Sequence, residues 1–319
     1  MKILNLANEG TGTFGEHEDD IKTDIRFKIK NFPDGQKDIV INPEDVIPNT
    51  PVQITSHFNS AEDMFKIICA RVALNKLDVT EIHLFIPYIL GARSDRRFEK
   101  GGTSYLVEVV APMINRQKFK TVTCLDAHSD VAQGCIERLE VITNTELVKW
   151  ALEDLHKMNE GHFPKSSIRI AAPDQGATRK IFNIAHDLQI ESPILFCVKH
   201  RDQKTGKILH TEVPIGTPQD YTDYIIIDDI CDGGRTFIEI AKEIRRQHEA
   251  NETQCRVFLI VSHGIFSNDF NDLNRWLDGI YTTNSITCYG WPVQLLNQQP
   301  KNLKVMNIIN TQIKTNQYA

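Results

Sequence analysis

The segment Tyr224-Ile225-Ile226-Ile227-Asp228-Asp229-Ile230-Cys231-Asp232-Gly233-Gly234-Arg235-Thr236 decides the fold class of this chain. Its first four residues predict a buried strand, and the amphipathic stripe that follows it predicts a helix. That stripe consists of Phe237, Ile240, Ala241 and Ile244. A strand that leads through a glycine-containing loop into a helix is typical of parallel α/β sheets, in which ligands bind at the carboxyl ends of the strands. We therefore expect this loop to hold a ligand.

The residues of the loop indicate what that ligand is. Asp228 and Asp229 end the predicted strand, and paired carboxylates suit the vicinal hydroxyls of a sugar or a Mg²⁺ ion bound to it. Gly233 and Gly234 let backbone N–H groups approach a phosphate, which the following helix N-terminus also attracts. A solvated acidic turn needs only one or two of these features. The loop therefore predicts a site for a phosphorylated sugar.

The same alternation of strands and helices extends along most of the chain. Apolar runs predict strands at 82–87, 121–126, 168–172, 194–198, 224–228 and 257–261. Helical stripes lie between them, one formed by Met64, Ile67, Ile68 and Val72 with Ser60 as N-cap, and another by Leu106, Val109, Val110 and Met113. This pattern predicts an α/β fold whose mainly parallel sheets have helices on both faces.

A break in the pattern between Glu146 and Ser167, with Gly161-His162-Phe163-Pro164 near its end, predicts a domain boundary. We expect two α/β domains of similar size, 1–147 and 148–319. The polar, amide-rich tail after Pro300 forms either a strand that packs back on the body or a frayed end.

Composition narrows the class of protein. The 319 residues are 41% hydrophobic and carry a formal net charge of -6, which argues against a nucleic acid partner. No apolar run is long enough to span a membrane, and the N-terminus lacks the pattern of a signal peptide. The seven cysteines are scattered without a C-x-x-C pair, which predicts a reducing, cytoplasmic location and neither disulfides nor a zinc site.

One motif is misleading. Gly10-Thr11-Gly12-Thr13-Phe14-Gly15 matches the dinucleotide fingerprint G-x-G-x-x-G. Glu16, Glu18, Asp19 and Asp20 follow it in place of an amphipathic helix, so a pyrophosphate would meet carboxylates instead of a helix N-terminus. We expect a flexible loop here. The chain also lacks the G-x-x-x-x-G-K-[ST] motif of P-loop kinases.

The loop after residue 227 resembles the phosphoribosyl-pyrophosphate (PRPP) signature of type I phosphoribosyltransferases, in which D-T-G-G-T follows two acidic residues. Six further segments, in order, are similar to segments of the ribose-phosphate pyrophosphokinases. They are Asn31-Phe32-Pro33-Asp34-Gly35-Gln36, Ile86-Pro87-Tyr88 with Ala92-Arg93-Ser94-Asp95-Arg96-Arg97, Asp126-Ala127-His128-Ser129-Asp130, Pro173-Asp174-Gln175-Gly176-Ala177, Lys199-His200-Arg201-Asp202, and Ser262-His263-Gly264-Ile265-Phe266-Ser267. The resemblance covers residues 25 to 290.

This resemblance implies two phosphoribosyltransferase-like domains and a diphosphotransferase. The expected reaction moves the pyrophosphoryl group of Mg-ATP to the 1-hydroxyl of ribose 5-phosphate, giving PRPP and AMP for nucleotide biosynthesis. In that family the loop that carries Phe32 and Asp34 comes from a neighbouring subunit, so a homo-oligomer, a dimer or a hexamer, is implied.

The resemblance also implies roles for individual residues. Lys199 and Arg201 would stabilise the transferring group, on a loop through Gln203-Lys204-Thr205-Gly206-Lys207 that closes as a lid. ATP would contact Phe32, Asp34, Gln36, Arg93, Ser94, Asp95, Arg96 and His128. The sugar phosphate would contact Asp174, Asp228, Asp229, Asp232, Gly233, Gly234, Arg235 and Thr236. His128 and Asp174 would hold Mg²⁺, with Asp174 the stronger ligand because Mg²⁺ prefers oxygen.

Simpler interpretations of these residues remain open. Lys199 and Arg201 are also what a solvated surface loop contains, and Arg93 and Arg96 would form surface salt bridges with Asp95 and Glu99. A histidine after a strand is often structural.

The sequence departs from the family pattern at four positions. Gln36 replaces Glu and Ser94 replaces Gln near the expected adenosine site. In the sugar-phosphate loop Gly233 replaces Thr and Arg235 replaces Gly. Either Arg235 points away and ribose 5-phosphate binds, or the pocket accepts a larger 5-substituent such as ADP-ribose, which would connect the protein to NAD metabolism. Ribose 5-phosphate is our prediction, and ADP-ribose stays open.

Two other functions compete with this one. A phosphoribosyltransferase that consumes PRPP would need neither two α/β halves nor the Lys199 and Arg201 loop. A regulatory homologue without catalysis would have no reason to retain Lys199, Arg201, His128 and Asp174 together.

Overall fold

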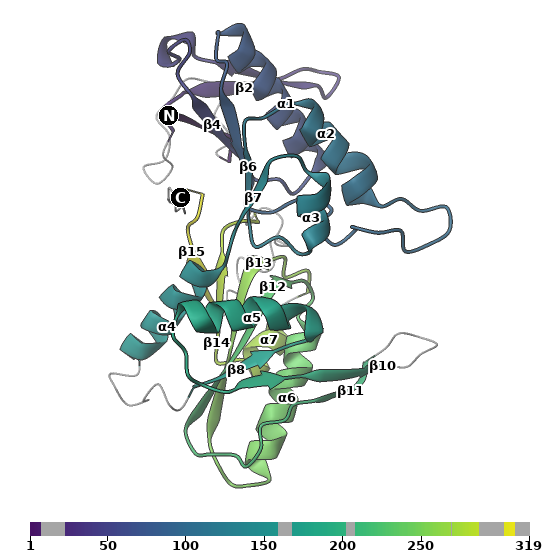
Figure 1. Ribbon diagram of the computed structural model, residues 1–319, viewed down its shortest axis with the longest axis vertical. Helices are drawn as coiled ribbons and strands as arrows, with labels where there is room; N and C mark the ends of the chain where they lie inside the picture. The colour runs from purple at the N-terminus through teal and green to yellow at the C-terminus, as the bar shows by residue number, and fades with distance from the viewer. Residues whose placement is uncertain (8–22, 159–167, 202–207, 269, 287–302, 310–319) are drawn as a thin grey trace. The chain divides into compact units, whose positions relative to one another are not determined.

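The computed structural model describes residues 1–7, 23–158, 168–201, 208–268, 270–286 and 303–309, with the side chains of 158, 200, 201, 208 and 209 excepted. The chain divides into two compact units (Figure 1). The first comprises Met1–Thr143 and short segments that begin at Ser285 and Asn307, and the second comprises Asn144–Asn284 and the last strand. The predicted G-x-G-x-x-G loop and the Gly161–Pro164 segment lie outside the described residues.

The first unit contains a five-stranded parallel sheet with the strand order β1-β4-β5-β6-β7. Its strands are β1 (Lys2–Asn5), β4 (Val52–Thr55), β5 (Ile82–Phe85), β6 (Val122–Leu125) and β7 (Leu139–Ile142). An antiparallel hairpin is formed by β2 (Phe27–Asn31) and β3 (Lys37–Ile41), and a 3-10 turn (Pro43–Asp45) follows it. The helices are α1 (Ala61–Lys76), α2 (Ala111–Arg116), which continues a π-helical segment (Tyr105–Val110), and α3 (Asp130–Cys135).

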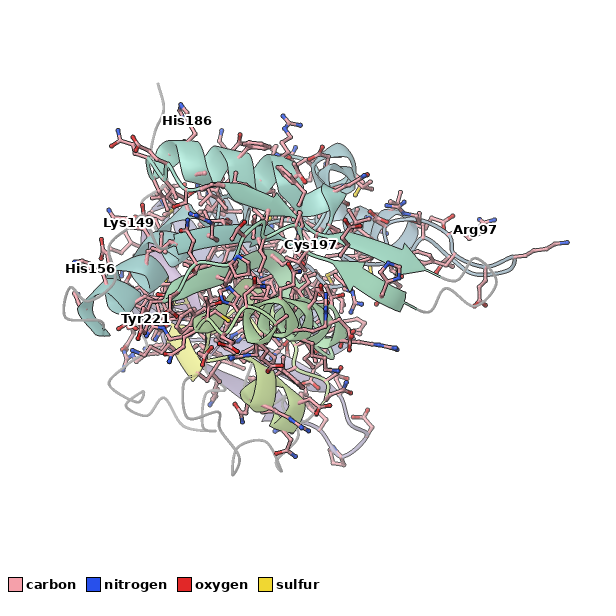
Figure 2. All side chains as sticks on the ribbon, turned by 90° about the horizontal axis from the view of Figure 1, so that it is seen from below. Arg97, Lys149, His156, His186, Cys197 and Tyr221 are labelled. Carbon is pink, nitrogen blue, oxygen red and sulfur yellow. The ribbon has the colours of Figure 1, made fainter. Side chains whose placement is uncertain are left out.

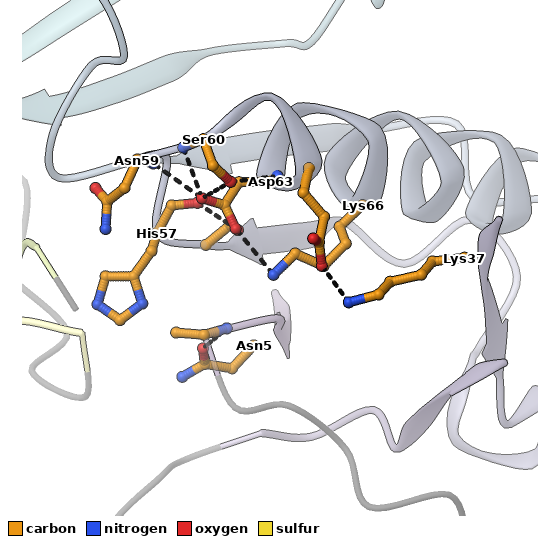
Figure 3. Close-up of polar contacts among 10 residues, drawn as sticks. Asn5, Lys37, His57, Asn59, Ser60, Asp63 and Lys66 are labelled. Atoms are coloured by element: carbon orange, nitrogen blue, oxygen red, sulfur yellow. Dashed lines mark hydrogen bonds and ion pairs between the residues drawn. The ribbon is translucent and has the colours of Figure 1, made fainter. Parts of the chain in front are cut away.

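The start of α1 confirms the predicted N-cap. The Ser60 hydroxyl accepts a hydrogen bond from the Asp63 backbone N–H at 3.2 Å, and the Asp63 carboxylate accepts one from the Ser60 backbone N–H at 3.0 Å (Figure 3). This capping box satisfies two N–H groups that would otherwise lack partners. Met64 and Ile67 are buried as predicted, but Val72 is 46% exposed, so its assignment to the buried face was wrong. The buried face continues through Ala70 and Leu74 instead.

The second unit contains a six-stranded sheet with the order β15-β14-β13-β12-β8-β9, in which all neighbours are parallel. Its strands are β8 (Ile168–Ala172), β9 (Ile194–Phe196), β12 (Thr222–Cys231), β13 (Cys255–Gly264), β14 (Gly279–Thr283) and β15 (Leu303–Met306). The hairpin β10 (Val198–Arg201) and β11 (Ile208–Glu212) follows β9, and the helices are α4 (Thr145–Met158), α5 (Gln175–Asp187), α6 (Arg235–Glu249) and α7 (Asn271–Trp276). The tail is therefore a strand over these four residues.

Successive side chains of β12 pack in two different apolar clusters. Ile225 and Ile227 pack in one apolar cluster with residues of α4 and α5, whereas Tyr224 and Ile226 pack in another with residues of α6 and α7. This alternation is the reason for the continuous apolar sequence of the strand, because both faces of the sheet are covered by helices. The predicted α/β architecture with helices on both faces is confirmed.

The order of strands in the second unit reverses next to β12. From β8 the chain crosses through α5 to β9 on one side, and β12 then pairs with the other side of β8 and continues to β13. Such a reversal is the topological switch point at which α/β sheets leave a crevice beyond the carboxyl ends of the strands. The main strands of the first unit follow one another in one direction and have no such reversal.

The described part of the chain contains no helix with the length and hydrophobicity needed to cross a membrane.

A buried histidine makes the stability of the second unit depend on pH. His248 is 1% exposed, and its ring nitrogens contact the Tyr224 hydroxyl at 2.9 Å and the Thr253 hydroxyl at 2.8 Å. Burial lowers the pKa of His248 below its ordinary value. The unfolded chain therefore takes up a proton more readily, and the free energy of unfolding falls as the pH drops from about 6.5 towards the pKa of the folded state.

We expect His248→Gln to flatten this pH dependence, measured as the urea midpoint between pH 7.5 and pH 5. His186→Gln is the matched control, because His186 projects from α5 and its side chain is 90% exposed (Figure 2). An equally steep loss in the His248 variant would contradict the assignment.

Candidate active site

Three carboxylates lie at the switch point of the second unit. Asp174 lies two residues after the end of β8, while Asp228 and Asp229 lie in the last part of β12, the neighbouring strand. Asp228 experiences the negative charge of both other carboxylates. The structure thus brings together residues that are more than fifty positions apart in the sequence.

The carboxylates of Asp228 and Asp229 lie close enough for their charges to repel each other. Asp229 is 7% exposed, Asp228 is half-buried, and the Asp228 carboxylate accepts a hydrogen bond from the Asp229 backbone N–H at 2.9 Å. Burial and the neighbouring Asp229 charge raise the pKa of Asp228 well above its usual range. Lys180, on α5, lies 4.0 Å from the Asp229 carboxylate. A bound cation or hydroxyl donor would relieve the repulsion between the two carboxylates.

The N-terminus of α6 is suited to an anion. Gly234 occupies the N-cap position with φ 75°, and no side chain caps the helix. The first N–H groups of α6 therefore lack a side-chain acceptor, and the helix dipole adds an attractive field for phosphate. Gly234 is required here both by its positive φ and because a Cβ atom would lie 2.7 Å from Leu273.

The remaining loop residues differ in exposure. Thr236 is half-buried, whereas Arg235 is exposed and makes no hydrogen bond or ion pair within the described part of the chain. Asp232 accepts a hydrogen bond from the Ser267 hydroxyl at 2.5 Å, and the Gly233 carbonyl accepts one from the Asn268 amide at 3.2 Å. Sequence reasoning had included Ser267 only as part of a motif and had missed Asn268 and Lys180. A polar residue after a strand gives no sign of which loop it will contact.

Lys199 and Asp174 are ion-paired. The Lys199 ammonium donates to the Asp174 carboxylate at 3.1 Å, and the lysine side chain is 11% exposed. The other Asp174 oxygen accepts from the Ala177 backbone N–H at 3.2 Å and caps α5. The proposed catalytic lysine thus contacts the proposed metal ligand directly. The side chain of Arg201 and the whole predicted lid, 203–207, lie outside the described residues.

Cys197 lies between these residues in sequence, where the sheet meets the β10–β11 hairpin (Figure 2). Burial raises the pKa of its thiol to about 12. The thiol therefore stays protonated near neutral pH and is a packing residue, not a nucleophile.

In the first unit, two of the motifs assigned to ATP meet around Asp95. This carboxylate is 6% exposed, and it accepts hydrogen bonds from the Arg96 guanidinium at 2.9 Å and the Ser129 hydroxyl at 2.7 Å. The Arg96 hydrogen bond, followed by that of Ser129, lowers the pKa of Asp95. Asp95 therefore holds the two motifs together, and the Asp95–Arg96 salt bridge considered at the outset is present. Arg93 and His128 are exposed, and Ser94 is half-buried.

Asp126 starts the second of these motifs in an unusual conformation. It is 4% exposed and has φ 41° in the left-handed region. Residues held there often mark functional loops. His128 follows two residues later and is exposed.

The remaining predicted ATP residues lie at the tip of the β2–β3 hairpin. Phe32 is 43% exposed, and Asp34 and Gln36 are exposed as well. The Gln36 backbone N–H donates to the Asp34 carboxylate at 3.1 Å, which fixes the turn. The hairpin therefore presents an aromatic face and an acceptor to solvent, but the structure shows no contact between this tip and the Asp95 cluster among the described residues.

A pocket of about 920 Å³ lies elsewhere in the second unit. It is lined by side chains of α4, including Lys149 and His156 (Figure 2), and by the first residues of β8 and β12. These are the amino ends of the strands, opposite the carboxylates. The pocket is therefore separate from the candidate active site.

Comparison with known proteins identifies the relatives of this chain. It is 25% identical over 285 residues to a ribose-phosphate pyrophosphokinase of Marinomonas sp., an alignment that covers 89% of this chain and 80% of the relative. It is 24% identical over 295 residues to a ribose-phosphate pyrophosphokinase of Pyrococcus abyssi, covering 90% and 93%. The chain is a homologue of the ribose-phosphate pyrophosphokinases.

The fold agrees with that relationship. The crystal structure of a phosphoribosylpyrophosphate synthetase from Mycobacterium smegmatis superposes with a TM-score of 0.68 at 16% identity, covering 89% of this chain and 86% of that one. No protein-family model matches the chain. The similarity extends over both units, which confirms the predicted phosphoribosyltransferase-type fold.

The raised pKa of Asp228 predicts that its negative charge destabilises the folded protein. Its folded state keeps a proton in the pH range where the unfolded chain has lost it, so the protein loses stability as the pH rises through this range. Asp228→Asn removes the charge at nearly constant shape. We expect a higher melting temperature at pH 8, by about 2–4 °C for each kcal/mol gained, and a smaller gain at pH 5.

Differential scanning calorimetry at both pH values measures this effect. Asp187→Asn, which changes a carboxylate that is 52% exposed on α5, is the matched control and should leave the melting temperature nearly unchanged. A lower melting temperature for Asp228→Asn at pH 8 would show that the carboxylate pair is stabilising.

Proposed function

We propose that this chain transfers the pyrophosphoryl group of Mg-ATP to the 1-hydroxyl of ribose 5-phosphate, producing PRPP and AMP. The observation that carries the proposal is the arrangement at the switch point of the second unit. There, the buried Asp229 and half-buried Asp228, an uncapped helix N-terminus and a lysine lie at the carboxyl ends of neighbouring strands. The relationship to the ribose-phosphate pyrophosphokinases supports this chemistry.

Each part of the acceptor has a complementary group. The 5-phosphate would bind the N–H groups of residues 233–236 at the start of α6. The ribose hydroxyls would donate to Asp228 and Asp229, whose carboxylates hold lone pairs that a sugar diol can satisfy. This orientation would direct the 1-hydroxyl away from the loop, where it can attack the β-phosphorus of ATP.

Mg²⁺ fits the donors that the chain provides. Within the described residues no cluster of three or more His, Cys, Asp or Glu side chains forms a closed metal cage. Mg²⁺ usually binds one or two carboxylates together with substrate phosphates and waters, so a closed cage is not needed. Asp174 would supply the carboxylate in the second unit, and a ligand role for His128 stays a prediction from the resemblance alone. The ion would neutralise charge on the phosphoryl oxygens as the transfer proceeds.

Lys199 and Arg201 would stabilise the transferring group. In the structure Lys199 is held by Asp174. Asp174 would hold Mg²⁺ when the ion is bound, and the Lys199 ammonium, which donates to Asp174 in the structure, would then be able to bind phosphoryl oxygens. In this proposal Phe32, Asp34, Gln36, Arg93, Ser94, Arg96 and His128 serve ATP, and Asp95 serves it indirectly by anchoring Arg96 and Ser129.

One observation favours ADP-ribose as a second candidate acceptor. The Arg235 guanidinium is exposed and makes no hydrogen bond or ion pair with described residues, at the helix end that would bind the 5-phosphate. A second phosphate on the acceptor would give it a partner, and Arg binds phosphate oxygens in a bidentate manner.

The acceptor is tested by measuring AMP. The protein is incubated with Mg-ATP and either ribose 5-phosphate or ADP-ribose, and AMP is quantified by chromatography. We expect AMP with ribose 5-phosphate. If AMP forms only with ADP-ribose, the acceptor is ADP-ribose and not ribose 5-phosphate. If the protein binds both sugar phosphates but forms no AMP, a regulatory homologue is favoured.

Lys199→Ala tests the catalytic assignment. Removing one charge-stabilising donor costs about 100- to 1,000-fold in kcat, so we expect a loss of that size with little change in the circular dichroism spectrum. Lys149→Ala is the matched control, because Lys149 is exposed on α4 at the pocket far from the carboxylates. Full activity in Lys199→Ala would refute the role of this lysine.

We also propose that the protein is a homo-oligomer, a dimer or a hexamer. Phe65 is 61% exposed and Val72 46% exposed, and their spacing places both on one face of α1. The opposite face of α1 is buried, so this helix is apolar on two sides. Burying the outer face of α1 against another copy would remove it from water.

We expect Phe65→Asp to reduce the molar mass measured by light scattering after size-exclusion chromatography. Ile47→Asp is the control, since Ile47 is 53% exposed and lies outside α1. A wild-type protein that elutes as a monomer would end the proposal.

A further inference from the structure

The loop 232–234 is held by two side chains from the segment that follows β13. The Ser267 hydroxyl donates to the Asp232 carboxylate at 2.5 Å, and the Asn268 amide nitrogen donates to the Gly233 carbonyl at 3.2 Å. Two loops that are more than thirty residues apart in sequence are thus joined at the end of the sheet that would bind the acceptor.

The Asn268 side chain fills the space that a side chain at position 233 would need. A Cβ atom on Gly233 would lie 2.6 Å from the Asn268 amide nitrogen and 3.2 Å from its Cγ atom. Gly233 lacks the positive φ that requires glycine, in contrast to Gly234. A side chain at position 233 would therefore displace the Asn268 amide from its place against the loop, without adding backbone strain.

The chemistry of an amide suggests a second use for Asn268. Its nitrogen carries two N–H donors, and the Gly233 carbonyl accepts one of them. The residue is exposed, so the second donor is accessible to a ligand at the same loop. We propose that Asn268 is a specificity-determining residue that donates this second N–H to the 5-phosphate of the acceptor. This inference rests on the proposed function for the identity of the acceptor.

This assignment changes how the Gly233 substitution is understood. The family pattern has a threonine hydroxyl at this position. In this chain an amide from a different loop occupies the same space and supplies a donor. The glycine therefore does not widen the phosphate pocket, and any preference for a larger acceptor would have to come from Arg235.

The test uses four variants of the full-length protein: Asn268→Ala, Asn268→Asp, Gly233→Thr, and Gly233→Thr combined with Asn268→Ala. Dissociation constants for ribose 5-phosphate and for inorganic phosphate are measured by isothermal titration calorimetry, and KM and kcat are measured from AMP release. Asn274→Asp, which adds the same charge on an exposed position of α7, is the matched control.

We expect Asn268→Ala to weaken the binding of ribose 5-phosphate and of inorganic phosphate by the same factor, about 10-fold, because one hydrogen bond to a charged group is lost. KM should rise while kcat changes little. Asn268→Asp should weaken the binding of both ligands further, because its charge repels phosphate. Gly233→Thr alone should also bind weakly, since it collides with Asn268. The double variant should recover much of the affinity, because the threonine hydroxyl gains the vacated space.

Other outcomes overturn the inference. Unchanged phosphate affinity in both Asn268 variants would leave Asn268 as a structural clamp only. Equal losses in Asn268→Ala and Asn268→Asp would lead to the same conclusion. Affinity losses in this pattern without AMP formation would refute the proposed reaction while keeping Asn268 as a phosphate ligand, whereas wild-type protein that binds no ribose 5-phosphate would refute both.

Discussion

The placement of two adjacent carboxylates, one buried and one half-buried, at the end of a central strand is the constraint on which the rest of this structure depends. β12 is apolar on both faces from Tyr224 to Ile227, and Asp228 and Asp229 follow at its carboxyl end, where a polar ligand can meet the strand. Placing two like charges there is unfavourable unless something binds them. The raised pKa of Asp228 indicates that ionising both carboxylates is unfavourable in the free protein, and a bound cation or hydroxyl donor would offset that cost. Sites that trade stability for binding are common in enzymes.

The two helices at the switch point are suited to ions of opposite charge. α5 begins with its own carboxylate, Asp174, which caps the helix and leaves an oxygen for a cation. α6 begins with Gly234, which caps nothing and leaves the first N–H groups for an anion. A helix N-terminus favours negative charge in either case, supplied by the protein in α5 and by a ligand in α6. Substrates that combine phosphate with a magnesium ion match this arrangement.

Much of this could be predicted from the sequence, because its signals are local. The apolar run before Asp228, the two glycines and the helical stripe of α6 specify a strand, a loop and a helix whatever the rest of the chain does. The Ser60 N-cap is similarly local and was predicted correctly, whereas the reciprocal contact from Asp63 was not predicted. Val72 was not, because spacing places a residue on a helix face but does not show how far the neighbouring sheet extends. The continuation of β9 into a separate hairpin at Cys197 was also missed, since the apolar run gives no sign that pairing changes partner there.

By itself, the sequence determined the α/β class, the identity of the acidic and glycine residues in the sugar-phosphate loop, and the order of motifs shared with the ribose-phosphate pyrophosphokinases. Only the tertiary structure decided which side chains from distant segments meet these residues: Lys199 on Asp174, Lys180 near Asp229, and Ser267 and Asn268 on the loop itself. The physical reason is the strand order. Parallel strands joined by crossovers bring the carboxyl ends of β8, β12 and β13 to one edge of the sheet, and the segments that follow them meet there whatever their separation in sequence.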